Sequence, residues 1–136
     1  RISGPLFDRI DLHIDVPAVA ASDLSLPPAA EGSAEVAARV ARARAVQAAR
    51  YQGAGTGKPV RTNAEADGEL LMAVAAPDAA GAAPLLEAVD AMKLSARAYH
   101  RILRVARTLA DLEGADAVRR LHIAEALSHR RLAIRA

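Results

Sequence analysis

The clearest hydrophobic pattern in the sequence lies between Leu94 and Leu112, where apolar residues recur at helical spacing. One face of the expected helix carries Tyr99, Ile102, Leu103, Ala106, Leu109 and Ala110, and the opposite face carries Arg97, His100, Arg101, Arg104, Arg107, Thr108 and Asp111. A serine hydroxyl caps a helix start well and a glycine often ends one, so Ser95 and Gly114 mark the expected limits.

Four other stretches are expected to form helices because they show the same spacing. They cover about Ala34–Tyr51 with Ser33 as its cap, Asp67–Ala75, a stretch from about Pro84 to the residue before Lys93, and Arg120–Leu132. We place the third start near Pro84 because a proline inside a helix costs about 3 kcal/mol. The apolar stripes expected to face the core are Val36, Val40, Ala43 and Val46 in the first of these helices and Leu121, Ala124 and Leu127 in the last.

The first residues of the chain show a different pattern. From Asp11 to Val16 polar and apolar residues alternate, which predicts a half-buried β-strand. No other stretch offers a partner strand, so this strand is an orphan in an extended arm, and Pro17–Pro28 reads as a linker. We therefore divide the chain into residues 1–28, the arm, and residues 29–136, a small all-α helical bundle with short connections.

Composition narrows the classes of protein. The sequence contains no cysteine, which excludes disulfides and thiolate metal sites, and no run of about 18 apolar residues that would span a membrane. No signal-peptide pattern opens the chain, so a cytoplasmic protein is expected. The formal charge of +2 does not by itself indicate a nucleic-acid partner. Since the sequence begins at Arg1 and runs directly into patterned residues, we expect a piece of a longer protein.

Two familiar kinds of site are not supported by the residues. The segment Gly55–Lys58 resembles part of a phosphate-binding loop, but Gln52 stands where that motif needs glycine and Pro59 where it needs serine or threonine. Asp11, His13 and Asp15 could face the same side of a strand, yet such alternation is far commoner on a solvated face than in a metal site. We expect no metal site, and no nucleophile stands near a base at a recognisable spacing.

The polar face of the Leu94–Leu112 helix is the strongest candidate site. It carries four arginines and a histidine but only one acid, whereas a face that serves solubility alone usually mixes both signs. The residues leave two interpretations open. The face is either a solvated basic surface or a phosphate-binding surface, because the guanidinium group matches phosphate oxygens well.

Three stretches together resemble a known family. Ile2–Val16 is similar to the end of the ATPase core in the magnesium-chelatase-like branch of AAA+ proteins, and Glu35–Arg50 is similar to the helix that follows it. Leu94–Gly114 and His122–Leu127 resemble the C-terminal lid of that branch, as found in its ComM/YifB group. The resemblance is weak over residues 53–90, which are rich in alanine, glycine and proline.

This resemblance implies roles for individual residues. Arg9, in Asp8-Arg9-Ile10-Asp11, falls on the arginine finger of a related S-R-F-D-like motif and would reach the ATP of an adjacent subunit. Arg97 falls on the sensor 2 arginine, which contacts the γ-phosphate at the start of a lid helix. Arg101 and Arg104 follow on the same face and would support it. Positioned guanidinium groups stabilise the charge that develops on a transferred phosphoryl group.

The resemblance also implies a parent protein, a hexameric AAA+ ATPase ring that binds ATP with Mg²⁺ and remodels DNA. Its implied partners are its own core and the neighbouring subunits. The sequence has no Walker A, Walker B or pore-loop motif, so by itself it is expected neither to bind ATP tightly nor to hydrolyse it. Two alternatives stay open. One is a small basic helical module that binds DNA through the central helix and the helix carrying Arg39, Arg42 and Arg44. The other is an assembly domain whose basic faces contact only neighbouring subunits.

Overall fold

The computed structural model describes residues 9–27, 30–54 and 59–130 and confirms an all-α fold. Its elements are a short 3₁₀ helix η1 (Ala21–Ser25) and the α-helices α2 (Ser33–Arg50), α3 (Gly68–Ala75), α4 (Ala79–Met92), α5 (Ala96–Glu113) and α6 (Arg120–Ser128). Within those residues there is no sheet, and the one β-bridge joins Pro77 to Val118. The segment Gly55–Lys58 and the predicted last turn at Leu132 lie outside the described residues.

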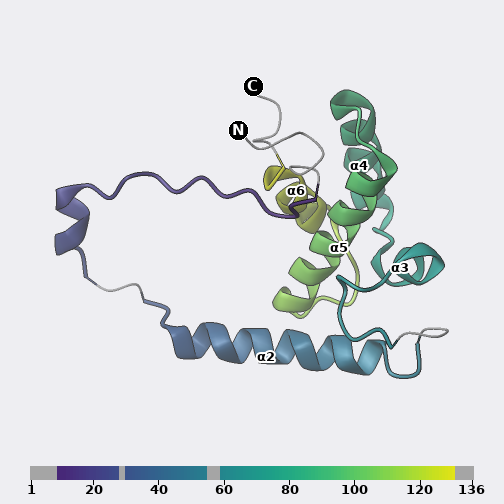
Figure 1. Cartoon of the computed structure of the whole chain (residues 1–136), viewed down its shortest axis with the longest axis horizontal. Coiled ribbons are helices and arrows are strands. Elements are labelled where there is room, and N and C mark those ends of the chain that lie inside the picture. Colours follow the sequence, from purple (N-terminus) through teal and green to yellow (C-terminus); the bar gives the residue numbers. More distant parts are fainter. Residues whose placement is uncertain (1–8, 28–29, 55–58, 131–136) are drawn as a thin grey trace.

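Helix α5 is the centre of the bundle. It packs against α2, α3 and α6, while α4 packs on α6. Figure 1 shows α2 lying across one end of the other helices, with the arm leaving the bundle beside α6. The largest fully buried apolar side chains come from α3, α4, α5, α6 and the loop before α6: Leu71, Leu85, Ile102, Leu103, Ile123 and Val118. The apolar face of α5 therefore supplies the surface on which the core is built.

The predicted limits and apolar face of α5 are confirmed. The Ser95 hydroxyl accepts a hydrogen bond from the Ala98 amide at 3.2 Å, which satisfies one of the free amides of the first turn. Gly114 closes the helix in the left-handed conformation with φ of 79°. Ile102, Leu103, Ala106 and Ala110 are fully buried, as the pattern predicts.

Helix α2 is less buried than its sequence predicts. It begins one residue earlier than expected, because Gly32 is the cap and its amide donates to the Glu35 carboxylate at 3.0 Å. Of the predicted apolar stripe only Ala43 is buried, together with Gln47, and the three valines are exposed: Val36, Val40 and Val46. Only the C-terminal half of α2 contacts α5, so the N-terminal half projects from the bundle (Figure 1).

Helix α4 shows that the prediction of a start near Pro84 was wrong. The helix begins at Ala79 and continues through Pro84. The Asp78 carboxylate accepts from the Gly81 amide at 2.8 Å, and the Asp78 amide donates to the Val118 carbonyl at 2.9 Å. These bonds hold the first turn in place, and they offset the backbone hydrogen bond that proline cannot make.

The predicted core face of α6 was wrong at Leu121 and Ala124, which are exposed, but right at Leu127, which packs half-buried against the core. Leu121 is 76% exposed, whereas His122, Ile123 and Ala126 are buried. The bridge between Pro77 and Val118 buries Val118 just before the helix. That contact fixes how the chain enters α6, and therefore which side of the helix faces the bundle.

The extended arm carries no paired strand in the described part of the chain. Residues 11–16 are not part of a strand, and their apolar side chains are largely exposed, up to 80% at Val16. The amide of His13 donates to the carbonyl of His129 at 3.0 Å, which attaches the arm to the end of α6. The arm is extended as predicted, but its apolar face is not covered (Figure 1).

Candidate functional site

The candidate site contains the four arginines of α5, and these differ sharply in their surroundings. Arg107 is only 3% exposed, so its predicted place on a solvated face was wrong. Its guanidinium donates to the carbonyls of Asp116 at 2.7 Å and Ala115 at 2.6 Å, and its Nε donates to Asp111 at 3.1 Å. Arg107 therefore ties the loop after α5 to the helix.

Asp111 is a second residue of that face which is buried, with its carboxylate fully enclosed. It accepts from Arg50 of α2 at 2.9 Å, from the Asn63 amide at 2.8 Å and from Arg107. Burial alone would raise the pKa of Asp111, but the hydrogen bonds from Arg50 and Asn63 and the positive charges nearby outweigh it, so the pKa lies below its usual value. This carboxylate joins α2, the loop before α3, and α5.

Arg104 and Arg101 each face a carboxylate as well. Arg104 donates to the Ala66 carbonyl at 2.9 Å and lies 3.2 Å from the Asp67 carboxylate. Arg101 reaches outward to the arm, where its Nη1 lies 3.1 Å from Oδ1 of Asp11. Both charges are therefore partly balanced within the molecule.

Arg97 differs from the other three. It is exposed in the first turn of α5, two residues after the Ser95 cap. Within the described ranges it makes no ion pair and no side-chain hydrogen bond. The amides of a first helical turn present partial positive charge, so an anion near Arg97 would meet both the guanidinium and the helix dipole.

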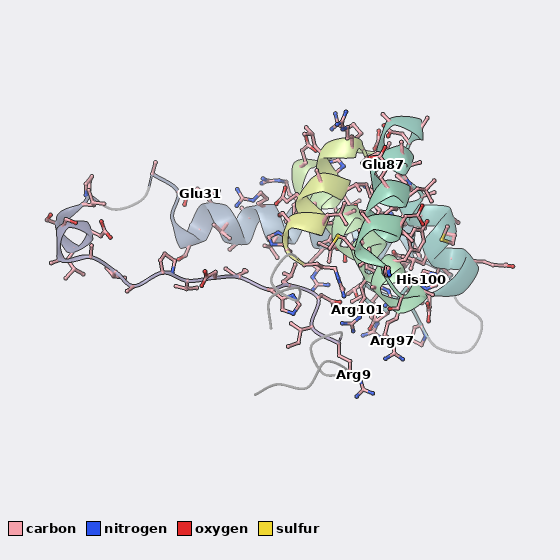
Figure 2. The ribbon with its side chains drawn as sticks, turned by 90° about the horizontal axis from the view of Figure 1, so that it is seen from above. Arg9, Glu31, Glu87, Arg97, His100 and Arg101 are labelled. Carbon is pink, nitrogen blue, oxygen red and sulfur yellow. The ribbon has the colours of Figure 1, made fainter. Side chains whose placement is uncertain are left out.

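Arg9 is also exposed, at the start of the described arm. It lies two residues before Asp11, which is paired with Arg101, so the arm brings Arg9 to the α5 side of the bundle. Figure 2 shows Arg9, Arg97 and Arg101 at the same edge of the molecule, with Glu31 well away from them. The structure thus links the arm that carries Arg9 to the helix that carries Arg97 through a third predicted residue, Arg101.

The other candidate sites gain no support from the described residues. Among them, no group of three or more histidine, aspartate or glutamate side chains is arranged to hold a metal ion. A cavity of about 260 Å³ lies between the arm and α5, lined by Asp11, Leu12, Leu109 and His129 among others.

No described helix is long and apolar enough to cross a membrane.

Comparison with known proteins identifies the family. The model of the family described as magnesium chelatase, subunit ChlI C-terminal, matches residues 30–130. The chain belongs to this family. The prediction of a magnesium-chelatase-like C-terminal part is thereby confirmed.

Full-length relatives show how much of a protein this domain represents. The chain is 37% identical to competence protein ComM of Haemophilus influenzae over 131 residues, which cover 96% of the chain and 24% of that protein. It is 39% identical to an uncharacterized protein of Mycobacterium tuberculosis over 135 residues, 99% of the chain and 26% of that protein. It is 35% identical to the uncharacterized protein YifB of Salmonella typhimurium, with 96% and 24% covered. The chain therefore spans about a quarter of the length of these relatives.

Sequence reasoning missed the buried polar network of this magnesium chelatase C-terminal domain. Asn63 was not singled out, although it is 1% exposed and its side chain contacts Arg50, Tyr51, Thr108 and Asp111. One signal was present in the sequence. Asp111 is the only acid on the basic face of α5 and stands four residues after Arg107, the spacing at which helical side chains pair.

Proposed function

We propose that this domain is the lid of a AAA+ ATPase and that Arg97 contacts the γ-phosphate of ATP bound to the same polypeptide. One observation carries the proposal. Arg97 is the one arginine of α5 that the described residues leave without a carboxylate or carbonyl partner, and it is exposed in the first turn. A guanidinium in this position has its donors available for a phosphate.

Arg9 is proposed as the arginine finger that completes the nucleotide site of the adjacent subunit. Two observations support this role. The Arg9 side chain is exposed, and the arm next to it is held against α5 by the Asp11–Arg101 ion pair and against the end of α6 by the His13–His129 hydrogen bond. A finger must be positioned as well as charged, since the rate gain comes from a guanidinium placed at the transferred phosphoryl group.

Arg101 and Arg104 are proposed to support Arg97 without contacting the phosphate directly. They continue the same face, but each lies close to a carboxylate, Asp11 or Asp67, so they add little net positive charge. The direct phosphate contact is therefore assigned to Arg97 alone.

The parent protein is proposed to be a cytoplasmic ring, with six subunits as the expected number, that hydrolyses Mg²⁺-ATP to remodel DNA. The support comes from the family and from the word "competence" in the name of the ComM relative, since competence is the uptake of transforming DNA. In this arrangement the lid senses the nucleotide and moves against the core as a rigid body. Catalysis requires the core, so the domain alone is expected to be inactive.

The test is ATP hydrolysis by the full-length protein. We expect Arg97→Ala and Arg9→Ala each to lower turnover by about 10³-fold or more, the range found for arginine fingers. Arg120→Ala is a matched control, because Arg120 is an exposed arginine in the first turn of another helix, α6, and should leave turnover unchanged. Near-normal turnover in either test variant rejects the role of that residue.

The structure favours this proposal over a free-standing DNA-binding module. Arg39 is paired with Glu31, and Arg42 and Arg44 are two residues apart, so they point to different sides of α2 and do not form a basic stripe. A filter-binding titration of the domain on DNA compares the two functions. Tight binding that falls steeply with salt would favour the DNA-binding module instead.

A further inference from the structure

We propose that the ion pair between Asp11 and Arg101 positions the finger Arg9 from the same helix that carries Arg97. Asp11 and Arg101 are then positioning residues that couple two neighbouring nucleotide sites of the ring. This inference rests on the function proposed above and adds a physical connection between its two arginines.

The connection is short. Arg101 stands four residues after Arg97, one helical turn and about 6 Å along α5. Its Nη1 lies 3.1 Å from the Asp11 carboxylate, and Asp11 is separated from Arg9 by one residue, a reach of about 7 Å at most. Arg9 and Arg97 are thus joined through a single ion pair and a rigid turn of helix.

The arm is attached to the bundle at this point and becomes exposed beyond it. The His13 amide donates to the His129 carbonyl at 3.0 Å, two residues after Asp11. The apolar side chains of the arm are more exposed after this point, 69% at Ile14 and 80% at Val16, than before it, where Ile10 is 38% and Leu12 47% exposed. Two contacts close together therefore determine where the segment carrying Arg9 lies: an ion pair to α5 and a backbone hydrogen bond to the residue that caps the end of α6.

Coupling follows from the two roles. In the proposed ring Arg97 reads the nucleotide of its own subunit, whereas Arg9 acts on the nucleotide of the neighbour. The arm leads out of the core, whereas α5 belongs to the lid. A shift of α5 after hydrolysis in its own site therefore changes the Asp11–Arg101 contact, and with it the position of Arg9. Coupling between two sites requires a structural element whose position depends on both of them. Helix α5 with its attached arm is such an element, because it carries Arg97 and holds the segment with Arg9.

A direct phosphate contact by Arg101 is the alternative, and it has a different signature. A direct ligand would change the affinity for ATP, and an aspartate at position 101 could not be compensated from position 11. A positioning residue would act on turnover through Arg9, and reversing both charges of the pair would restore the contact.

The experiment uses Asp11→Arg, Arg101→Asp and the double swap in the full-length protein, with radiolabelled ATP to follow low rates. We expect each single variant to lower kcat by about 10- to 100-fold, the cost of displacing a positioned group by about 1 Å, with KM for ATP within about 2-fold. The double swap should recover kcat to within about 3-fold. In an Arg9→Ala background, Arg101→Asp should have no added effect, because the residue through which it acts is absent.

Two further measurements complete the design. Glu31→Arg breaks the ion pair between Arg39 of α2 and Glu31, which stands just before that helix and far from Arg101 in Figure 2, and it should leave kcat unchanged. Hydrogen exchange of the full-length protein reports on the arm without reference to activity. Arg101→Asp should remove the protection of the His13 amide, and the double swap should restore it.

The outcomes separate this inference from the function on which it rests. If Arg9→Ala and Arg97→Ala lower turnover by about 10³-fold while Asp11→Arg and Arg101→Asp leave kcat unchanged, the coupling is wrong and the lid function stands. A raised KM without rescue, or an effect of Arg101→Asp that adds to Arg9→Ala, overturns the coupling in favour of direct contact. Normal turnover in Arg9→Ala removes the function and the coupling together.

Discussion

Removal of the Asp111 carboxylate should destabilise the domain more than any surface change. In Asp111→Ala the buried guanidinium of Arg107 loses its counter-charge, and Arg50 and Asn63 lose an acceptor. Breaking a buried ion pair by removing one partner typically costs about 3–5 kcal/mol. Arg107 keeps the carbonyls of Ala115 and Asp116, which favours the lower end, about 3 kcal/mol.

Urea unfolding of the domain, followed by far-ultraviolet circular dichroism, measures this loss directly. Glu31→Ala is the matched control, because it removes a carboxylate from an arginine on an exposed surface, where the pair contributes little. Its free energy of unfolding should not change measurably. A loss below about 1 kcal/mol in Asp111→Ala would show that solvent reaches the network and that burial of these charges does not stabilise the fold.

The same carboxylate predicts how stability changes with pH. The pKa of Asp111 is below its ordinary value of 3.8 in the folded state, so the unfolded chain takes up this proton first as pH falls. The stabilisation is fully present above that value and is lost as pH falls through the lower folded pKa. The asparagine side chain in Asp111→Asn cannot titrate. The free energy of unfolding of this variant should therefore decline less steeply below about pH 4 than that of the unsubstituted domain.

Three further tests of the bundle, two of its packing and one of a helix cap, use thermal unfolding. Ile123→Ala should cost about 2–5 kcal/mol because the side chain is fully buried, while Leu121→Ala, at an exposed position, should be close to neutral; the reverse order would contradict the orientation of α6. Ser95→Ala should cost about 1 kcal/mol through the lost cap of α5, and Ser95→Thr should retain most of it. Gly81→Ala should cost about 1–3 kcal/mol, because the new methyl group would lie 3.1 Å from Pro77 and 3.2 Å from the Arg120 backbone; an unchanged melting temperature would contradict that packing.

The local signals in the sequence were sufficient wherever a helix depended on its own residues. Helix α5 has a regular apolar face, a serine at its start and a glycine just after its end, and the structure agrees with all three. The same holds for the all-α class. These features depend on contacts between residues only a few positions apart. The family resemblance rests on the residues themselves, in Ile2–Val16, Glu35–Arg50, Leu94–Gly114 and His122–Leu127.

Other features depended on contacts that the sequence does not encode locally. The start of α4 and the orientation of α6 both follow from the Val118 backbone meeting the Pro77–Asp78 segment, about 40 residues earlier in the chain. The exposure of Val36 and Val40 follows from how far α2 extends beyond α5. A pattern of apolar spacing identifies a helix, but it does not state which neighbour, if any, will cover it.

The candidate site shows the same division most clearly. The sequence by itself determined that four arginines share one face of α5 and that Arg97 stands in its first turn. Only the tertiary structure decided that Arg107 is buried against Asp111, that Asp111 meets Arg50 from 61 positions away, and that Arg101 holds the arm. The physical reason is that a charge is neutralised by whichever opposite charge the fold brings within a few ångströms, and sequence spacing does not contain that distance.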